Sequence, residues 1–218
     1  MRQSLALAFF AAGTALMMAL YHDELLLFAL MSISAAACLA IDGWKNARVF
    51  LIAMLVGGAC ENIAVMLGAW SYSNAGYLFA PLWLPVGWGM SVVLLEEAFV
   101  GGAHEPAFSK KSVIMAFGGT VATGFAFSSE IGVLLCFAAV TVALYAIGFY
   151  HRSELKAGLA AAVLGTAMET ICIIAGNWHY SAAIFGTPLW LPLCWFNAFL
   201  IMRRVARAGG SENKDKFS

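Results

Sequence analysis

Long apolar runs separated by short polar segments make up almost the whole chain. A membrane-spanning helix needs about 20 apolar residues, and eight runs come close to that length. The eight predicted spans are 4–21, 25–41, 49–70, 80–99, 112–128, 131–150, 157–177 and 187–205. The pattern therefore predicts an all-α integral membrane protein whose main partner is the lipid bilayer.

Two stretches of these runs carry the same motif. Residues 57–73 read GGACENIAVMLGAWSYS and residues 165–181 read GTAMETICIIAGNWHYS, with eight of 17 positions identical. Further along, PLWLPVGW at 81–88 returns as PLWLPLCW at 188–195. Each copy lies in the third and fourth predicted spans of its half, so the repeat unit contains four spans. Because four is an even number, both units would insert with one orientation, which predicts two parallel four-helix repeats.

The repeat divides the chain into four predicted parts. They are a first four-helix repeat at 1–100, a cytoplasmic linker at 101–111, a second repeat at 112–207 and a disordered cytoplasmic tail at 208–218. The tail is polar and lacks the apolar residues that a packed core requires.

Charge placement predicts the orientation in the membrane. Only 11% of the 218 residues are charged, and 62% are hydrophobic. Every second connection between the predicted spans lies on the same side of the membrane. None of the 12 Lys and Arg residues falls in the connections on one side, which are 22–24, 71–79, 129–130 and 178–186. The positive-inside rule then predicts a multi-pass plasma (bacterial inner) membrane protein with both termini in the cytoplasm. No basic patch indicates a nucleic-acid partner, and the Arg203–Arg207 cluster is expected to anchor a helix at the inner interface.

Glu61 and Glu169 are the candidate catalytic residues. An ionisable residue inside a membrane span is costly, which marks it as a candidate for function. Gly57 and Gly68 share a helical stripe with Glu61, and small residues let helices approach closely. Each glutamate is therefore expected to face the bundle interior. The alternative is that the two carboxyls only hold the halves together by hydrogen bonds.

Aromatic residues of the two motifs are the candidate substrate-binding residues. They are Trp70, Tyr72, Trp83, Trp88, Trp178, Tyr180, Trp190 and Trp195. Indole faces attract cations, so these rings could stabilise a carbocation or grip a flat polyene. The alternative for Trp70, Tyr72, Trp178 and Tyr180 is an aromatic belt at the membrane interface.

Other polar residues indicate structure rather than chemistry. Glu96 and Glu97 stand where the second repeat has Arg203 and Arg204, which predicts an ion pair between the halves or solvated helix ends. The five cysteines match no metal-site spacing and are expected to be small apolar fillers. No metal site or phosphate-binding loop is predicted.

The motif residues resemble a known family. Glu61, Gly68, Tyr72 and the segment 81–88 are similar to the carotenoid biosynthesis membrane family that contains carotenoid 1,2-hydratases, including bisanhydrobacterioruberin hydratase. The likeness covers about 55–95 and, through the repeat, 165–200. The Pro-Phe-Gly step before the tyrosines of that family is absent here. The resemblance implies cofactor-independent, proton-initiated chemistry on an isoprenoid double bond.

Three functions stay open at this point. The first is a membrane hydratase or cyclase that acts on a carotenoid or another isoprenoid-like hydrophobic small molecule. In this case one glutamate acts as the acid and the other accepts a proton or orients water. The second is a small proton-coupled transporter that uses the glutamate pair as proton carriers. The third is a non-catalytic membrane assembly factor.

Overall fold

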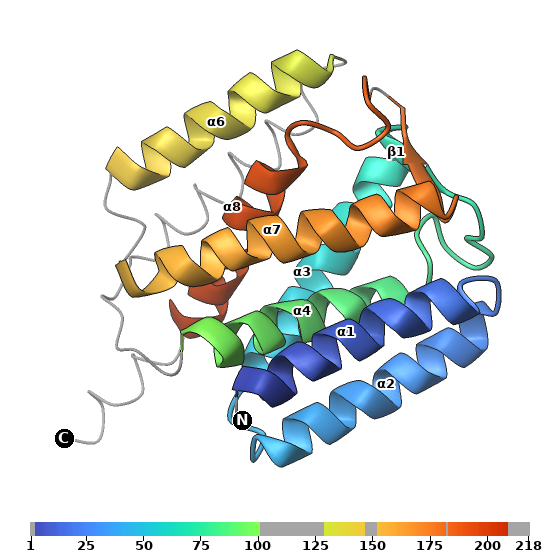
Figure 1. The fold of residues 1–218 in the computed structure, drawn as a ribbon, viewed down its shortest axis with the longest axis vertical. Helices are drawn as coiled ribbons and strands as arrows, with labels where there is room; N and C mark the ends of the chain where they lie inside the picture. The colour runs from blue at the N-terminus through green and yellow to red at the C-terminus, as the bar shows by residue number, and fades with distance from the viewer. Residues whose placement is uncertain (1–2, 101–128, 147–151, 182, 209–218) are drawn as a thin grey trace.

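The computed structural model describes residues 3–100, 129–146, 152–181 and 183–208 (Figure 1). Within them the chain forms seven helices and two short strands. In chain order they are α1 (Gln3–Leu20), α2 (Glu24–Ile41), α3 (Ala47–Met66), β1 (Trp70–Tyr72), α4 (Trp83–Phe99), α6 (Glu130–Ala146), α7 (Arg152–Ile174), β2 (Trp178–Tyr180) and α8 (Leu191–Ala208). The predicted linker 101–111, the predicted helix 112–128 and the predicted tail after Ala208 lie outside the described residues.

Four of the described helices are long and apolar enough to span a membrane. They are α1, α2, α3 and the Glu154–Ile174 part of α7, and α6 is a shorter apolar helix. The prediction of an integral membrane helical fold is confirmed. The prediction of eight spans is not, because α4 has only 17 residues and three arginines interrupt the end of α8.

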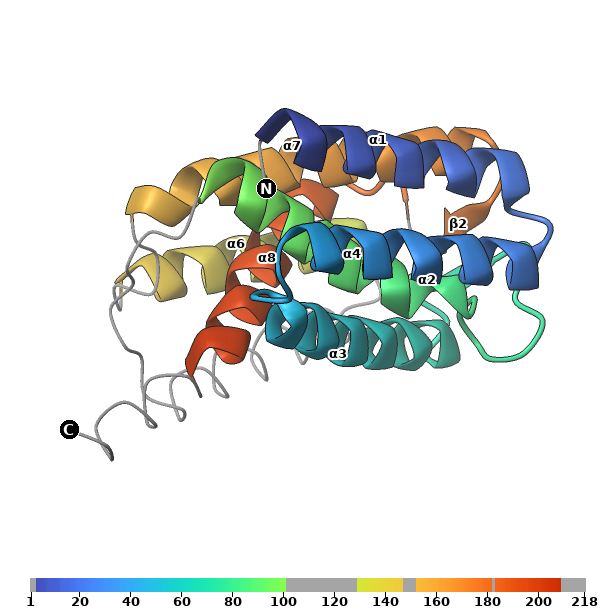
Figure 2. The ribbon, with the colours of Figure 1, turned by 90° about the horizontal axis from the view of Figure 1, so that it is seen from below.

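Helix α4 lies inside the bundle, with α1, α2, α3 and α7 packed around it (Figure 2). Val92, Val93, Leu94 and Leu95 are buried at successive positions. A helix that is apolar on all sides finds its stable place in the interior, which explains the central position of α4. Helix α3 also contacts α8, and α4 contacts α7, so the first half of the chain packs against the second.

Glycines set the distance between α3 and α4, and between α7 and α8. A Cβ on Gly57 would lie 2.4 Å from the Trp88 ring, and one on Gly165 would lie 2.1 Å from the Trp195 ring. The predicted close approach is therefore confirmed at these two positions, since no larger residue fits without displacing an indole.

Gly68 and Gly176 have a different role from the predicted one. The sequence predicts Gly68 on the helical stripe of Glu61, and its equivalent Gly176 on that of Glu169, but α3 ends at Met66 and α7 ends at Ile174. Both glycines have a positive φ, +75° and +77°. Glycine adopts this left-handed conformation without a steric penalty and commonly terminates helices. The predicted spans 49–70 and 157–177 therefore extend a few residues past the C-terminal ends of α3 and α7.

The two motif copies meet in an antiparallel strand pair between β1 and β2. Ser71 faces His179, its equivalent in the other repeat, and their side chains hydrogen bond at 2.9 Å. The Ser73 amide donates to the Asn177 carbonyl at 2.9 Å, and the Ser181 amide donates to the Ala69 carbonyl at 3.1 Å. Because equivalent residues exchange equivalent bonds, the strand pair has a local twofold relation that joins the halves at one end of the bundle.

Candidate functional site

Glu61 accepts hydrogen bonds on both carboxyl oxygens. It lies on α3 one turn after Gly57, where the missing side chain leaves space for an indole. Trp88 Nε1 donates to Oε1 at 3.0 Å, and Trp70 Nε1 and Tyr72 Oη donate to Oε2 at 3.0 and 2.7 Å. The residue is buried, so these aromatic donors replace the water that the carboxyl has lost.

Glu169 repeats this arrangement in the second half. Trp195 Nε1 donates to its Oε1 at 2.7 Å, and Tyr180 Oη donates to its Oε2. Glu169 is buried like Glu61. The expectation that both glutamates face the bundle interior is confirmed.

The two glutamates belong to one connected network. The rings of Trp88 and Trp195 are stacked, with centroids 4.8 Å apart and planes at 22°. Both glutamates line the same cavity, which measures about 50 Å³. Such a cavity has room for a few water molecules or one end of a hydrocarbon chain, and it cannot enclose a whole carotenoid.

The predicted substrate-binding residues divide into two groups. Tyr72, Trp83, Trp88, Trp178 and Trp195 line the cavity. Trp70, Tyr180 and Trp190 do not line it.

The three remaining residues pack on one another. Ring centroids are 5.2 Å apart for Trp70 and Tyr180 and 5.4 Å apart for Tyr180 and Trp190. Trp190 also stacks on Phe137 of α6 at 5.7 Å. This second cluster serves packing between the strand pair, α6 and the start of α8.

Trp83 contributes an unused hydrogen-bond donor. The residue is buried and lines the cavity. Its indole Nε1 has no hydrogen-bond partner among the described residues. Since buried polar groups are almost always paired, this donor indicates a place for the oxygen of a water or of a bound molecule.

A second pair of buried glutamates was missed by the sequence analysis. Glu24 accepts from the amides of Gly76 and Leu82 at 3.0 and 2.6 Å. Glu130 accepts from the amides of Ile184 and Leu189, both at 2.5 Å. Each carboxyl holds the loop that leads into α4 or α8. The pair lies 106 residues apart, whereas the motif copies lie 108 or 107 apart, so the alignment of the repeats did not reveal it.

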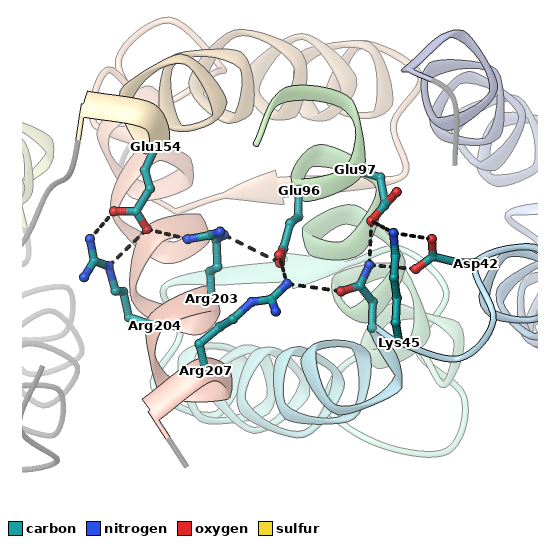
Figure 3. Close-up of polar contacts among 9 residues, drawn as sticks. Asp42, Lys45, Glu96, Glu97, Glu154, Arg203, Arg204 and Arg207 are labelled. Atoms are coloured by element: carbon teal, nitrogen blue, oxygen red, sulfur yellow. Dashed lines mark hydrogen bonds and ion pairs between the residues drawn. The ribbon is translucent and has the colours of Figure 1, made fainter. Parts of the chain in front are cut away.

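A charged cluster closes the end of the bundle opposite the strand pair (Figure 3). Glu154 of α7 accepts from Arg203 Nη1 at 2.6 Å and binds Arg204 through both oxygens. Glu96 of α4 pairs with Arg203 at 3.6 Å and with Arg207. The predicted ion pair between the halves is confirmed. The expectation that these arginines anchor α8 at the interface is wrong for Arg203 and Arg204, which are 1% and 3% exposed.

The turn between α2 and α3 extends this charged cluster. Lys45 Nζ lies 2.9 Å from Asp42 and 3.0 Å from Glu97. The pKa of Lys45 is raised above its usual value, mainly by the hydrogen bond to Asp42 and further by the hydrogen bond to Glu97. Asn46 Nδ2 donates to the same two carboxylates at 2.8 and 2.7 Å. The turn is thereby tied to the end of α4.

No protein-family model and no curated protein sequence matches the chain. Two solved structures share its fold. A cross-linked trimer of MvINS has a TM-score of 0.62 at 18% identity and covers 74% of this chain and 91% of that one. The mycobacterial Insig homologue MvINS from Mycobacterium vanbaalenii has a TM-score of 0.61 at 18% identity, with 72% and 92% covered. The chain thus has an Insig-like membrane fold.

These findings correct the functional expectation. The predicted hydratase or cyclase and the predicted proton-coupled transporter are wrong, because the structures that share the fold are Insig homologues and not carotenoid enzymes. The geometry agrees with this correction. The hydrogen bonds to Glu61 all come from aromatic N–H and O–H donors of the protein itself.

Proposed function

We propose that this protein is a non-catalytic membrane factor whose two halves form a rigid frame around a small lipid-binding cavity. One observation carries the proposal. Glu61 and Glu169 are each held by aromatic donors, and the stacked pair Trp88 and Trp195 joins the two sets. Carboxyls whose oxygens already accept hydrogen bonds from several helices and strands serve to hold those elements together.

The cavity supports binding of the hydrophobic end of a lipid-like molecule. Its apolar lining includes Phe9, Phe10, Met31 and Met90 from α1, α2 and α4. Methionine side chains are flexible and adapt to hydrocarbon chains of irregular shape. The free N–H of Trp83 would donate to a hydroxyl or carbonyl oxygen of the ligand. An oxygenated lipid therefore fits the lining better than a pure hydrocarbon.

We infer the number of membrane spans and the orientation of the protein in the membrane from the sequence. Eight spans in two parallel four-helix repeats would put both termini in the cytoplasm of a bacterial inner membrane. The local twofold relation of the strand pair supports two equivalent units. Reporter fusions at Lys45 and after Ala208 should both report a cytoplasmic position, and an external position of either would contradict this arrangement.

Trp83→Phe tests the cavity, because it removes the N–H donor and keeps an aromatic ring. The purified protein would be titrated with a fluorescent long-chain alcohol in detergent micelles. A lost hydrogen bond to a neutral group should weaken binding by about 1 kcal/mol, roughly fivefold. Trp44→Phe is the matched control, since Trp44 is 57% exposed and lies in the turn between α2 and α3. Equal affinity for both variants would contradict the proposed ligand contact.

The non-catalytic role has a separate test. The protein would be incubated with a bacterial lipid extract, and the lipids would be followed by mass spectrometry. We expect no lipid to be consumed. Consumption of a lipid by the wild type but not by Glu61→Gln would overturn the proposal.

A further inference from the structure

Two loops next to the strand pair carry large apolar side chains on their surface. In the loop between β1 and α4, Tyr77, Leu78 and Phe79 are 62%, 53% and 55% exposed. In the loop between β2 and α8, Ile184 and Phe185 are 59% and 77% exposed. Patches of this kind mark surfaces that contact a membrane or another protein.

Several backbone amides of both loops have hydrogen-bond partners inside the protein. Glu24 accepts hydrogen bonds from two backbone amides in and next to the first loop, and Glu130 accepts hydrogen bonds from two backbone amides in and next to the second loop. The Ala80 amide also donates to Asn62 Oδ1 at 3.2 Å. A loop in water needs no buried carboxylate for its amides, because the solvent accepts their hydrogen bonds. Irregular backbone at membrane depth does need such internal partners.

The loops also lack the charges that are typical of aqueous segments. Asp, Glu, Lys and Arg are absent between Glu61 and Glu96, and again between Glu169 and Arg203. The apolar surface continues from the spanning helices into the loops, because Met66 at the end of α3 is 62% exposed and Ile174 at the end of α7 is 80% exposed.

We propose that residues 76–80 and 184–187 lie in the interfacial layer of the bilayer, with the apolar tips in contact with lipid. Buried Glu24 and Glu130 act as internal clamps that supply hydrogen bonds where water is scarce. The partner is lipid because the apolar surface of the loops is continuous with that of the spanning helices. Tyr77 and Phe185, which are equivalent in the repeat, would enter the same layer from the two halves as aromatic anchors.

Spin labels test this placement. Phe185→Cys and Tyr77→Cys would each be made in protein whose five native cysteines are replaced by alanine, and then labelled with a nitroxide in phosphatidylcholine vesicles. Oxygen dissolves in lipid and relaxes nitroxide labels there, whereas a nickel chelate stays in water and relaxes labels that are exposed to water. Leu55→Cys is the control for a label in lipid, because Leu55 and Leu51 of α3 are 65% and 50% exposed. Lys45→Cys is the control for a label in water.

We expect both loop labels to lose most of the nickel relaxation seen at Lys45→Cys while they keep oxygen relaxation like that of Leu55→Cys. Nickel relaxation equal to that of Lys45→Cys would place the loops in water and overturn the proposal. Protection from both reagents would also overturn it, because a protein or a second copy would then cover the loops. Circular dichroism and a single elution peak, together with a lipid-like reading at Leu55→Cys, establish beforehand that the labelled protein is folded.

A second variant tests the clamp. Glu130→Gln keeps one carbonyl acceptor and loses the other, so one of its two loop amides loses its partner. The label at Phe185→Cys should then become more mobile, whereas the label at Tyr77→Cys, whose loop is held by Glu24, should not change. Unchanged mobility at Phe185→Cys would contradict the role of Glu130.

Discussion

The protein satisfies buried carboxylates in two different ways at two places in the bundle. Glu61 and Glu169 bind neutral indole and phenol donors, whereas Glu96 and Glu154 bind arginines. The first arrangement occurs twice, once in each repeat. Among the described residues the second arrangement is not repeated: Glu96 comes from the first half, whereas Glu154 and the arginines of α8 come from the second.

This difference shows how a repeated sequence can build both symmetric and complementary contacts. Aromatic donors bring no countercharge, so each half can make its own glutamate site. An ion pair needs opposite charges, and two identical halves would place like charges opposite each other. Divergence of the repeats to Glu96 in one and Arg203 in the other provides the pair that joins them.

Glu154→Ala should have the largest effect on this comparison. It leaves Arg203 and Arg204 buried without their shared carboxylate, and breaking a buried ion pair costs about 3–5 kcal/mol. We expect a strong loss of thermal stability in detergent or failure to accumulate in the membrane. Lys45→Ala is the control, because an exposed lysine contributes below about 1 kcal/mol. A similar melting temperature for both variants would contradict the difference between buried and exposed pairs.

Glu61→Gln should destabilise the aromatic site by a smaller amount. Donors approach both oxygens of Glu61, so the amide NH₂ of glutamine must face at least one N–H or O–H. The mismatch should cost about 1–3 kcal/mol, which thermal unfolding followed by near-ultraviolet circular dichroism would detect. Thr14→Ala, which removes one hydroxyl bond within α1, is a milder comparison. Wild-type stability of Glu61→Gln would show that these donors do not hold the carboxyl.

Gly165→Ala examines the packing that the aromatic site requires. The added Cβ would collide with the Trp195 ring, and overpacking of a core costs about 1–3 kcal/mol. Gly13→Ala is the matched control on α1, since a Cβ there meets nothing within 4 Å; helix propensity makes this change stabilising by about 0.5–1 kcal/mol. Opposite shifts of the two melting temperatures are expected, and equal shifts would rule out the close approach.

The Ser71 and His179 pair should have the smallest effect. It joins the halves at the strand pair but is exposed, so its net contribution is about 0.5 kcal/mol. A double-mutant cycle of Ser71→Ala and His179→Ala would measure the coupling. A coupling larger than the destabilisation measured for Glu154→Ala would reverse the order of importance proposed for the two ends.

Several features could be predicted from local sequence. The inward orientation of Glu61 and Glu169 follows from helical periodicity and the cost of a carboxyl in lipid. The close approach at Gly57 and Gly165 follows from the size of glycine. The opposite charges at Glu96 and Arg203 indicated an ion pair because the repeat placed them at equivalent positions.

Other features were decided only by the tertiary structure. Trp83 and Trp190 stand at equivalent positions of the two PLWLP segments, yet only Trp83 lines the cavity, because Trp190 stacks on Phe137 of α6. Glu24 and Glu130 stand directly before the predicted spans 25–41 and 131–150, and their loop amides lie more than 50 residues away. Gly68 could equally have continued a helix or ended one, and its positive φ decided this. Periodicity and burial cost are local properties of the chain, whereas the choice of hydrogen-bond partner depends on how distant helices pack, which no local pattern records.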